Sequence, residues 1–345
     1  MSDYQITGPY GHKNLAVFLL HSPQQHQRQF LTLDEGLKSG LVKVTEKASA
    51  QVNELMVEND SDLPLFLQEG DRLFGGKQDR ILYASLVVPP KSGPNPVPAF
   101  CVEPGRWSEG RSGERFEATT NSALAPLRVR NAAKLAKSQQ QVWQEVANFR
   151  FHHAHVVRAG ADSFGRVDFG PSTSLNEVLD DPAVVKLTQD YTAALETLLQ
   201  DKPDAVGVAI AVQGRFVEVN IYPNHQLLRR MYPRLLQSHV LDAISQKGGT
   251  QASSHPTPEN LRRLLTEGRQ KQKRTERVNA LNRLEIIELE FQDAKTGQWA
   301  HCMSYYDEQP IHLQWVSVNQ PTEMPDNPVP DTRDQRPRLL QQLNP

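Results

Sequence analysis

The sequence has few cysteines and no hydrophobic run long enough to cross a membrane. Cys101 and Cys302 are the only cysteines among 345 residues and form no CxxC pair, so no disulfide framework is predicted and a reducing compartment is favoured. The longest apolar runs are Leu15–Leu20 and Ala205–Val212, far short of the roughly 18 residues of a transmembrane helix. Met1–Asn14 lacks the basic and then apolar start of a signal peptide. We therefore expect a cytoplasmic protein without a membrane partner.

An excess of charge of one sign is also lacking. The chain has 38 Lys and Arg against 40 Asp and Glu, for a formal net charge of −2 at pH 7. The whole-chain charge therefore does not indicate a nucleic-acid or acidic-membrane partner. Hydrophobic residues make up 38% and charged residues 23% of the chain, which excludes a wholly disordered or fibrous protein. Length alone predicts roughly two domains.

Short strands are predicted throughout the first hundred residues, where apolar residues either alternate or run continuously. The predicted strands are Leu15–Leu20, Leu41–Glu46, Val52–Glu58, Leu63–Gln68, Ile81–Val88 and Ala99–Glu103. Pro89–Pro98 contains five prolines and is predicted to be a loop. Such closely spaced strands favour a sandwich- or barrel-like core over βαβ winding.

Helices are predicted mainly in the middle of the chain. Val129–Phe149 has no glycine or proline and places apolar residues near one face. Ser174 and Asp181 begin capping patterns, and Pro233 is expected to kink or divide a helix over His225–Gln246. Further strands are predicted at Ala205–Val212, Phe216–Tyr222, Leu284–Phe291, Trp299–Tyr306 and Ile311–Val318. The predicted fold class is therefore α+β, with several helices packed on a strand-rich core.

The strongest candidate site is Glu69–Arg80, with the sequence EGDRLFGGKQDR. Its glycines allow positive φ and close backbone approach, so exposed amides there can cradle an anion. Lys77 and Arg80 supply positive charge, and Glu69 is a candidate general base. The ligand-binding candidates in this segment are Gly75, Gly76, Lys77, Gln78, Asp79 and Arg80. The segment matches neither a Walker loop nor a GxGxxG fingerprint, and a glycine-rich turn with a solvated charged rim is the alternative.

A second candidate cluster is CVEPGRW, residues 101–107. On a strand, Cys101 and Glu103 point to the same side, and Glu103 is the second candidate general base. Arg106 and Trp107 follow a Pro-Gly turn and are candidates for gripping a planar or anionic ligand. Cys101 is a further ligand-binding candidate, and it becomes a nucleophile if nearby cations depress its pKa. A buried structural thiol is the alternative.

Two further patterns are weaker. His153 and His155 would share one face of a strand, but no carboxylate or thiol completes a zinc set, so no metal site is predicted. Arg262–Arg283 carries eight Lys and Arg against two Glu, a surplus of six, without interleaved aromatic residues for stacking bases. Because Thr266–Arg277 contains no apolar residue, we expect an exposed helix or a loose insertion within residues 259–283. Nucleic-acid contact by this segment is a minor alternative.

The order of these motifs resembles a bacterial family named for its association with ADP-ribosylglycohydrolase and rhodanese-phosphatase proteins. The resemblance covers roughly residues 10–310, and its most specific feature is GGKQxR followed by CVExGRW. Asp79 stands where an asparagine is expected, which would weaken an anion contact by this side chain. The resemblance implies a single α+β domain, which we place at residues 11–318 after a 1–10 extension. The composition of Gln320–Pro345, with six prolines and few large apolar residues, predicts a disordered tail at 319–345. The resemblance also implies a role near NAD or ADP-ribose metabolism, without assigning a reaction, a cofactor or a catalytic residue.

Two main hypotheses follow from these observations. In the first, the protein binds or processes a phosphorylated, nucleotide-like small molecule, with Lys77, Arg80 and Arg106 neutralising phosphate and Trp107 stacking on the ligand. In the second, the protein is a non-catalytic interaction or scaffold domain, and the GGKQDR segment is only a tight turn. The sequence leaves open whether the protein is an enzyme.

Overall fold

The computed structural model describes residues 4–47, 53–105, 115–119, 122–159, 173–246, 255–292 and 296–318. Over these residues the fold is mixed α+β, with 17 strands in three sheets, seven α-helices and one short π-helix. The predicted fold class is confirmed. None of the described helices combines the length and the hydropathy needed to cross a membrane.

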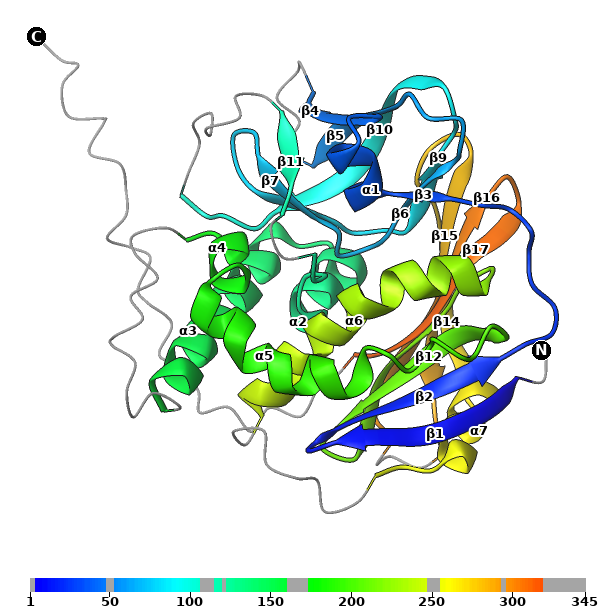
Figure 1. The fold of residues 1–345 in the computed structure, drawn as a ribbon. Helices are drawn as coiled ribbons and strands as arrows, with labels where there is room; N and C mark the ends of the chain where they lie inside the picture. The colour runs from blue at the N-terminus through cyan, green and yellow to red at the C-terminus, as the bar shows by residue number, and fades with distance from the viewer. Residues whose placement is uncertain are drawn as a thin grey trace, which may run out of the picture.

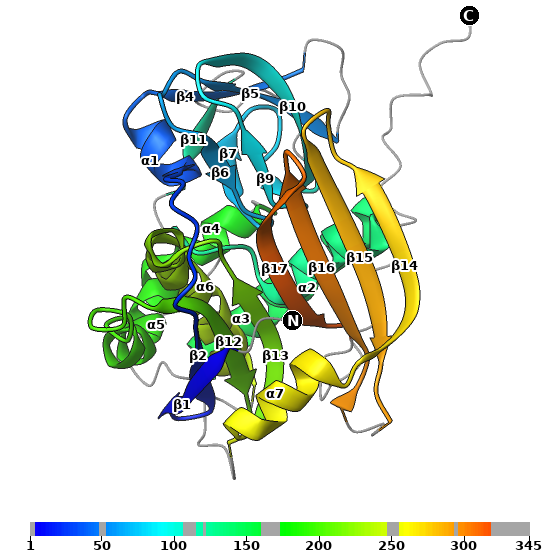
Figure 2. The same ribbon diagram turned by 90° about the vertical axis from the view of Figure 1, so that its right-hand side faces the viewer.

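The largest sheet is antiparallel and has eight strands. Its strands Leu15–His21 and Ala205–Val212 are almost entirely apolar because both faces of the sheet are covered there: Leu15, Val17 and Leu19 pack toward one side, and Ala16 and Phe18 toward the other. The strand order is β1 (Gln5–His12), β2 (Leu15–His21), β12 (Ala205–Val212), β13 (Arg215–Ile221), β17 (Gln309–Ser317), β16 (Trp299–Tyr306), β15 (Asn282–Glu290) and β14 (Arg269–Arg277). The helices α5 (Pro182–Leu195) and α6 (His225–Ser245) cover one face, and α7 (Pro258–Thr266) packs on the other (Figures 1 and 2).

A six-stranded sheet forms a nearly closed barrel above the helices (Figure 1). Its order is β11 (Phe116–Ala118), β7 (Arg72–Gly75), β8 (Arg80–Leu82), β10 (Ser92–Cys101), β5 (Glu54–Asn59) and β4 (Val42–Glu46). A single bridge between Thr45 and Arg115 joins its two outer strands. We call the incompletely closed junction between β4 and β11 the barrel seam. The helix α1 (Leu33–Lys38) lies beside it, next to a small sheet of β3 (Leu31–Thr32), β6 (Leu65–Leu67) and β9 (Leu86–Val88).

Helices connect the barrel to the large sheet. They are α2 (Leu127–Asn131), the π-helix η1 (Ala132–Ala136), α3 (Gln139–Ala159) and α4 (Leu175–Leu179). The Ser174 and Asp181 side chains cap α4 and α5 as the sequence predicted. The predicted continuous helix over Val129–Phe149 is wrong, because the chain passes through η1 and then adopts a left-handed conformation at Lys137 before α3 begins.

Two other expectations are corrected at the ends of the sheets. Residues 1–10 are not simply an extension, since β1 begins at Gln5 and pairs with β2. The segment Thr266–Arg277 is neither a helix nor a loose insertion. Most of it forms β14, which pairs along its length with β15, so backbone hydrogen bonds order a strand that has no apolar side chain to bury.

The predicted loop over Pro89–Pro98 is also corrected, because β10 begins at Ser92. Pro94, Pro96 and Pro98 occupy alternate positions of this strand, and successive N–H groups of a strand point to opposite edges. Ala99 donates its N–H toward Asn53 of the β5 side at 3.0 Å, whereas the prolines carry no N–H on the other edge. The strand tolerates three prolines because β8 pairs only with its last residues.

Candidate functional site

The two segments predicted to form the site meet in the structure. Gln78 donates from Nε2 to the Glu103 carbonyl at 2.7 Å, and the Asp79 N–H donates to Glu103 Oε2 at 3.1 Å. Cys101 lies opposite Arg80 in the β8–β10 pair. These contacts bring the GGKQDR turn and the Cys101–Glu103 stretch together, but they also use the polar groups that were expected to face a ligand.

The predicted cation Arg80 is buried and paired. Its guanidinium lies 3.2 Å from Glu46 of β4 and also donates to the Gln78 carbonyl at 3.1 Å. The backbone N–H of Lys77 donates to the same Glu46 carboxylate at 3.1 Å. The Glu46 carboxylate of β4 therefore accepts hydrogen bonds from two donors of the GGKQDR turn. These contacts tie β4 to the turn and stabilise the barrel.

The glycines of the turn allow β11 to approach β7. Gly75 has φ +121°, and a Cβ there would lie 2.6 Å from the Arg115 carbonyl oxygen. At Gly76, with φ +56°, a Cβ would lie 2.4 Å from the Phe116 ring. The Gly76 N–H donates to the Arg115 carbonyl at 3.2 Å. The glycine pair is thus required by close strand packing.

The remaining predicted residues are held in the same way or lie outside the described residues. The Asp79 carboxylate accepts from the Gly75 N–H at 3.1 Å and from the Ser174 hydroxyl, so it caps structural donors. Burial raises the pKa of the Cys101 thiol to about 11, which disfavours a thiolate nucleophile. Arg106 and Trp107 lie outside the described residues.

Glu69 belongs to a different group of charges, which lies where the barrel, the helices and the large sheet meet. Arg130 donates to both oxygens of Glu218 at 2.7 Å and to Glu69 at 2.7 Å. The Lys134 ammonium lies 2.7 Å from Glu69. We call this group the junction cluster: Glu69, Arg130, Lys134, Glu218, His239 and Gln314, each no more than 2% exposed. Glu69 and Glu103 therefore do not act as one pair of carboxylates.

Charge pairing determines the ionisation of the junction cluster. Burial acts to raise the pKa of Glu69, but Lys134 and Arg130 outweigh it and hold this pKa below its usual value. Glu218 behaves in the same way, with Arg130 and His239 holding its pKa well below the usual value. Both carboxylates are therefore ionised and hydrogen-bonded, as a buried ion pair requires. The cluster joins three parts of the fold, and none of its members lines the cavity described next.

Sequence reasoning found only Glu69 of this cluster. Arg130 and Lys134 occupy positions i and i+4 in an apolar helical pattern, and Glu218 interrupts the buried strand β13. Charged residues at core-facing positions are the sequence feature that could have indicated a buried ion-pair cluster, because such residues are buried almost only when they are paired. No local spacing could show which residues pair with which.

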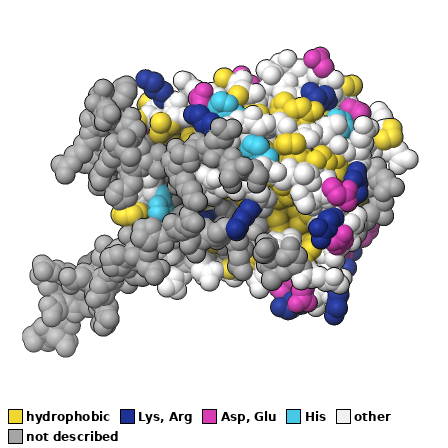
Figure 3. Space-filling view, turned by 90° about the horizontal axis from the view of Figure 1, so that it is seen from below, with side chains coloured by type: hydrophobic (Ala, Val, Ile, Leu, Met, Phe, Trp, Pro, Cys, Tyr) yellow, Lys and Arg dark blue, Asp and Glu magenta, His cyan; other side chains and the backbone are white. Residues whose placement is uncertain are grey.

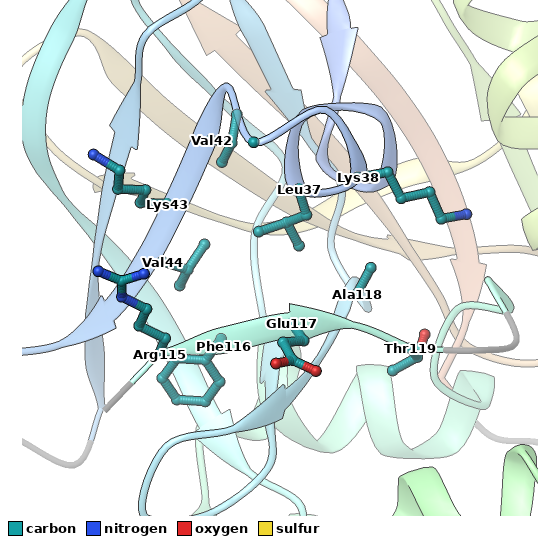
Figure 4. Close-up of a pocket in the computed structure, with 11 residues that line it drawn as sticks. Leu37, Lys38, Val42, Lys43, Val44, Arg115, Phe116, Glu117, Ala118 and Thr119 are labelled. Carbon is teal, nitrogen blue, oxygen red and sulfur yellow. The ribbon is translucent and has the colours of Figure 1, made fainter. Parts of the chain in front are cut away.

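A cavity of about 500 Å³ opens at the barrel seam, between α1, β4 and β11. Its apolar walls include Leu37, Val42, Val44 and Phe116. Figure 4 shows Lys43 and Arg115 at one end of the cavity and Lys38 at the other, with Glu117 on β11. We call this cavity the seam pocket, and its lining among the described residues is Leu37, Lys38, Gly40, Val42, Lys43, Val44, Arg115, Phe116, Glu117, Ala118 and Thr119.

The seam pocket adjoins the GGKQDR turn through β11. Phe116, which forms part of its floor, pairs with Gly75 in the β7–β11 ladder. The GGKQDR turn therefore positions one wall of the pocket without contributing its own side chains to the lining. Among the described residues, no group of three or more potential ligands gathers to hold a metal ion, and the side chains of His153 and His155 lie outside the description.

Fold and site together define an α+β protein in which a nearly closed barrel with a ligand-sized pocket is joined to an antiparallel sheet by buried ion pairs. The chain belongs to the ARPP-1 family, because the model of the ARG and Rhodanese-Phosphatase-superfamily-associated Protein domain matches residues 3–316. The resemblance noted in the motifs is confirmed. No curated protein and no solved structure matches the chain.

Proposed function

We propose that the protein binds a phosphorylated, nucleotide-like small molecule in the seam pocket. The single observation that carries this proposal is the combination of an apolar cavity with cations at both ends. A volume of about 500 Å³ is within the usual range for small-molecule sites, which are mostly apolar with a few polar groups that fix orientation. A planar base would pack between Leu37, Val44 and Phe116, and a phosphate would contact Arg115. Lys43 alternates with the buried Val42 and Val44 on β4, and its ammonium lies 3.8 Å from the Glu58 and Asp60 carboxylates, so it is not assigned to the phosphate.

The family supports the choice of ligand. Its description links it to ARG and rhodanese-phosphatase proteins, and we interpret ARG as ADP-ribosylglycohydrolase. A protein that accompanies such enzymes has ADP-ribose, NAD or ADP as its natural candidates. We therefore propose a role in NAD or ADP-ribose metabolism.

The lining favours binding over a reaction. Among the described lining residues, Glu117 is the only carboxylate and Thr119 the only hydroxyl, and none is a cysteine or a histidine. The side chains that most often serve as an activated nucleophile and its base are therefore absent from the described lining. We propose a binding role, such as sensing or sequestering the ligand.

Isothermal titration calorimetry with ADP-ribose, NAD and ADP tests this proposal. At least one of these ligands should bind, and Arg115→Gln should weaken it about tenfold, because the change removes a charge-assisted contact. Lys91→Gln is the matched control, since Lys91 is an exposed barrel lysine outside the pocket lining. Heat from none of the three ligands, or equal affinity in all variants, contradicts the proposal.

A protein-interaction role is the second candidate. A separate observation favours it: β14 forms an edge of the large sheet, and among the described strands it pairs only with β15.

A further inference from the structure

Among the described residues, β14 is an edge strand with a free side. It pairs only with β15, and eight of its nine residues are exposed, with Glu276 half-buried. Figure 2 shows β14 as the outermost strand of the eight-stranded sheet. The outward N–H and C=O groups of such a strand are a template for pairing with another chain.

The strand carries strong positive charge. RQKQKRTER contains five Lys and Arg and one Glu, a surplus of four. On the face of the molecule seen from below, several Lys and Arg side chains lie beside Asp and Glu (Figure 3). The edge thus combines free backbone hydrogen-bonding groups with charge of one sign.

Some of these charges are already used. Arg274 donates to the carbonyls of Lys134 and Leu135 at 3.0 and 2.9 Å, and Glu276 bonds to the Tyr83 hydroxyl at 2.7 Å. These contacts fix β14 against η1 before any partner arrives. An edge ordered in advance spares a partner the entropic cost of ordering it.

Other charges have no acidic partner in the described part of the chain. Lys273 pairs with Glu285 at 2.9 Å, whereas Lys271 has no ion pair there. Arg277 makes a 3.4 Å contact to the Ala280 carbonyl and lies opposite Arg283 across the ladder, whose own charge meets Glu308 at 3.3 Å. A neighbouring strand with acidic residues would give Lys271 and Arg277 ion-pair partners.

We propose that the free edge of β14 accepts an extended acidic segment of another protein as an added strand. Main-chain hydrogen bonds would supply affinity, as in other cases of strand addition. Acidic residues beside Lys271 and Arg277 would supply specificity, because opposite charges across neighbouring strands attract and like charges repel.

The charge pattern disfavours a second copy of this chain. An antiparallel pair of β14 strands centred on Lys273 would place Lys273 beside Lys273 and Arg269 beside Arg277. Like charges directly opposite are destabilising, and cationic edge residues are a known device against self-pairing.

The composition also disfavours nucleic acid. Single-strand binding sites use aromatic side chains as stacking platforms, and β14 contains none. A peptide satisfies both the backbone edge and the charges, whereas phosphates satisfy mainly the charges.

Fluorescence anisotropy with the full chain tests the proposal. The probe is a labelled peptide of alternating Glu and Val, compared with the same peptide N-methylated at every residue. The first should bind and the second should lose binding, because N-methylation at every residue removes the ladder hydrogen-bond donors on both edges of the peptide. Equal binding of the two peptides would overturn the proposal by showing attraction through charge alone.

A charge-reversal variant locates the surface. Lys271→Glu with Arg277→Glu should weaken the acidic peptide about tenfold or more, from the lost and reversed pairs. Lys91→Glu with Lys186→Glu makes the same change in net charge on other elements and should retain binding. Equal loss in both double variants counts against β14.

Two further readouts separate the remaining outcomes. Hydrogen exchange should slow at the amides of residues 269–277 when the acidic peptide is added, and unchanged exchange there would overturn the proposal. A labelled oligouridine that binds more tightly than the peptide would also overturn it. Because these measurements do not involve the seam pocket, their outcome is independent of nucleotide binding.

Discussion

The junction cluster and β14 contain the same kinds of residue in opposite settings. In the cluster, Arg130 and Lys134 are at most 2% exposed, and their charges meet Glu69 and Glu218 at 2.7 Å. In β14, nearly every side chain is exposed, and Lys271 has no acidic partner among the described residues. Burial makes pairing obligatory, since an unpaired buried charge is strongly destabilising. The comparison teaches that cations available to a ligand or partner lie at the surface of this fold.

Removing one member of the junction cluster should have the largest effect on stability. Arg130→Met leaves Glu69 and Glu218 buried without their shared cation, so we expect a loss of about 3–5 kcal/mol of unfolding free energy. Denaturant unfolding at pH 7 measures it. Arg262→Met is the matched control, because Arg262 pairs with Glu259 on the exposed surface of α7, where such pairs are worth about 0–1 kcal/mol. Similar losses in the two variants would contradict the distinction between buried and exposed pairs.

Buried histidine should make the fold sensitive to acid. Burial lowers the pKa of His312 to about 4; its ring stacks on Tyr222 and bonds to Ser85 and Asn220 at 3.0 Å. The unfolded chain binds a proton near pH 6.5 and the folded chain does not. Stability is therefore complete above about pH 6.5 and falls by up to about 3 kcal/mol as the pH approaches 4.

Unfolding free energy measured between pH 7 and pH 4 checks this expectation. His312→Gln should lose less stability over that range than the parent chain, whatever its stability at pH 7. His26→Gln is the control, because His26 is an exposed histidine whose Nδ1 accepts only a surface hydrogen bond from the Arg28 N–H at 2.9 Å among the described contacts. The same pH dependence in the parent chain and in His312→Gln would contradict the expectation that the burial of His312 causes the loss of stability in acid.

Much of the fold follows from local sequence patterns. Continuous apolar runs predicted the central strands β2 and β12, and capping residues placed the starts of α4 and α5. The proline-rich strand β10 and the polar strand β14 were missed for one reason. In the part that was mispredicted, each strand pairs with a single neighbour: β10 with β5 and β14 with β15. Backbone hydrogen bonds order these segments, and no side-chain pattern reveals that pairing.

The site was less predictable than the fold. Glycines beside charged residues look the same in a tight turn and in a ligand loop, so the GGKQDR segment alone could not decide between them. Arg80 pairs with Glu46, 34 residues away, and Glu69 pairs with Arg130, 61 residues away. These distant pairings determine that the charges are structural. The seam pocket depends on how β4 and β11 approach each other in space. Sequence therefore predicted that the two motifs meet, but not that their charges are paired.

The smallest expected effect on stability concerns Gly75 of the GGKQDR turn. Gly75→Ala should cost about 1–2 kcal/mol, because an L side chain at φ +121° is strained and the new Cβ would lie 2.6 Å from the Arg115 carbonyl oxygen. Gly93→Ala is the control, since nothing lies within 4 Å of a Cβ there. Thermal unfolding with nucleotide titration of both variants checks the expectation. Because Gly75 pairs with Phe116 on the pocket wall, Gly75→Ala should also weaken binding, whereas Gly93→Ala should not. Unchanged stability together with lost binding in Gly75→Ala would instead make the turn itself part of the ligand site.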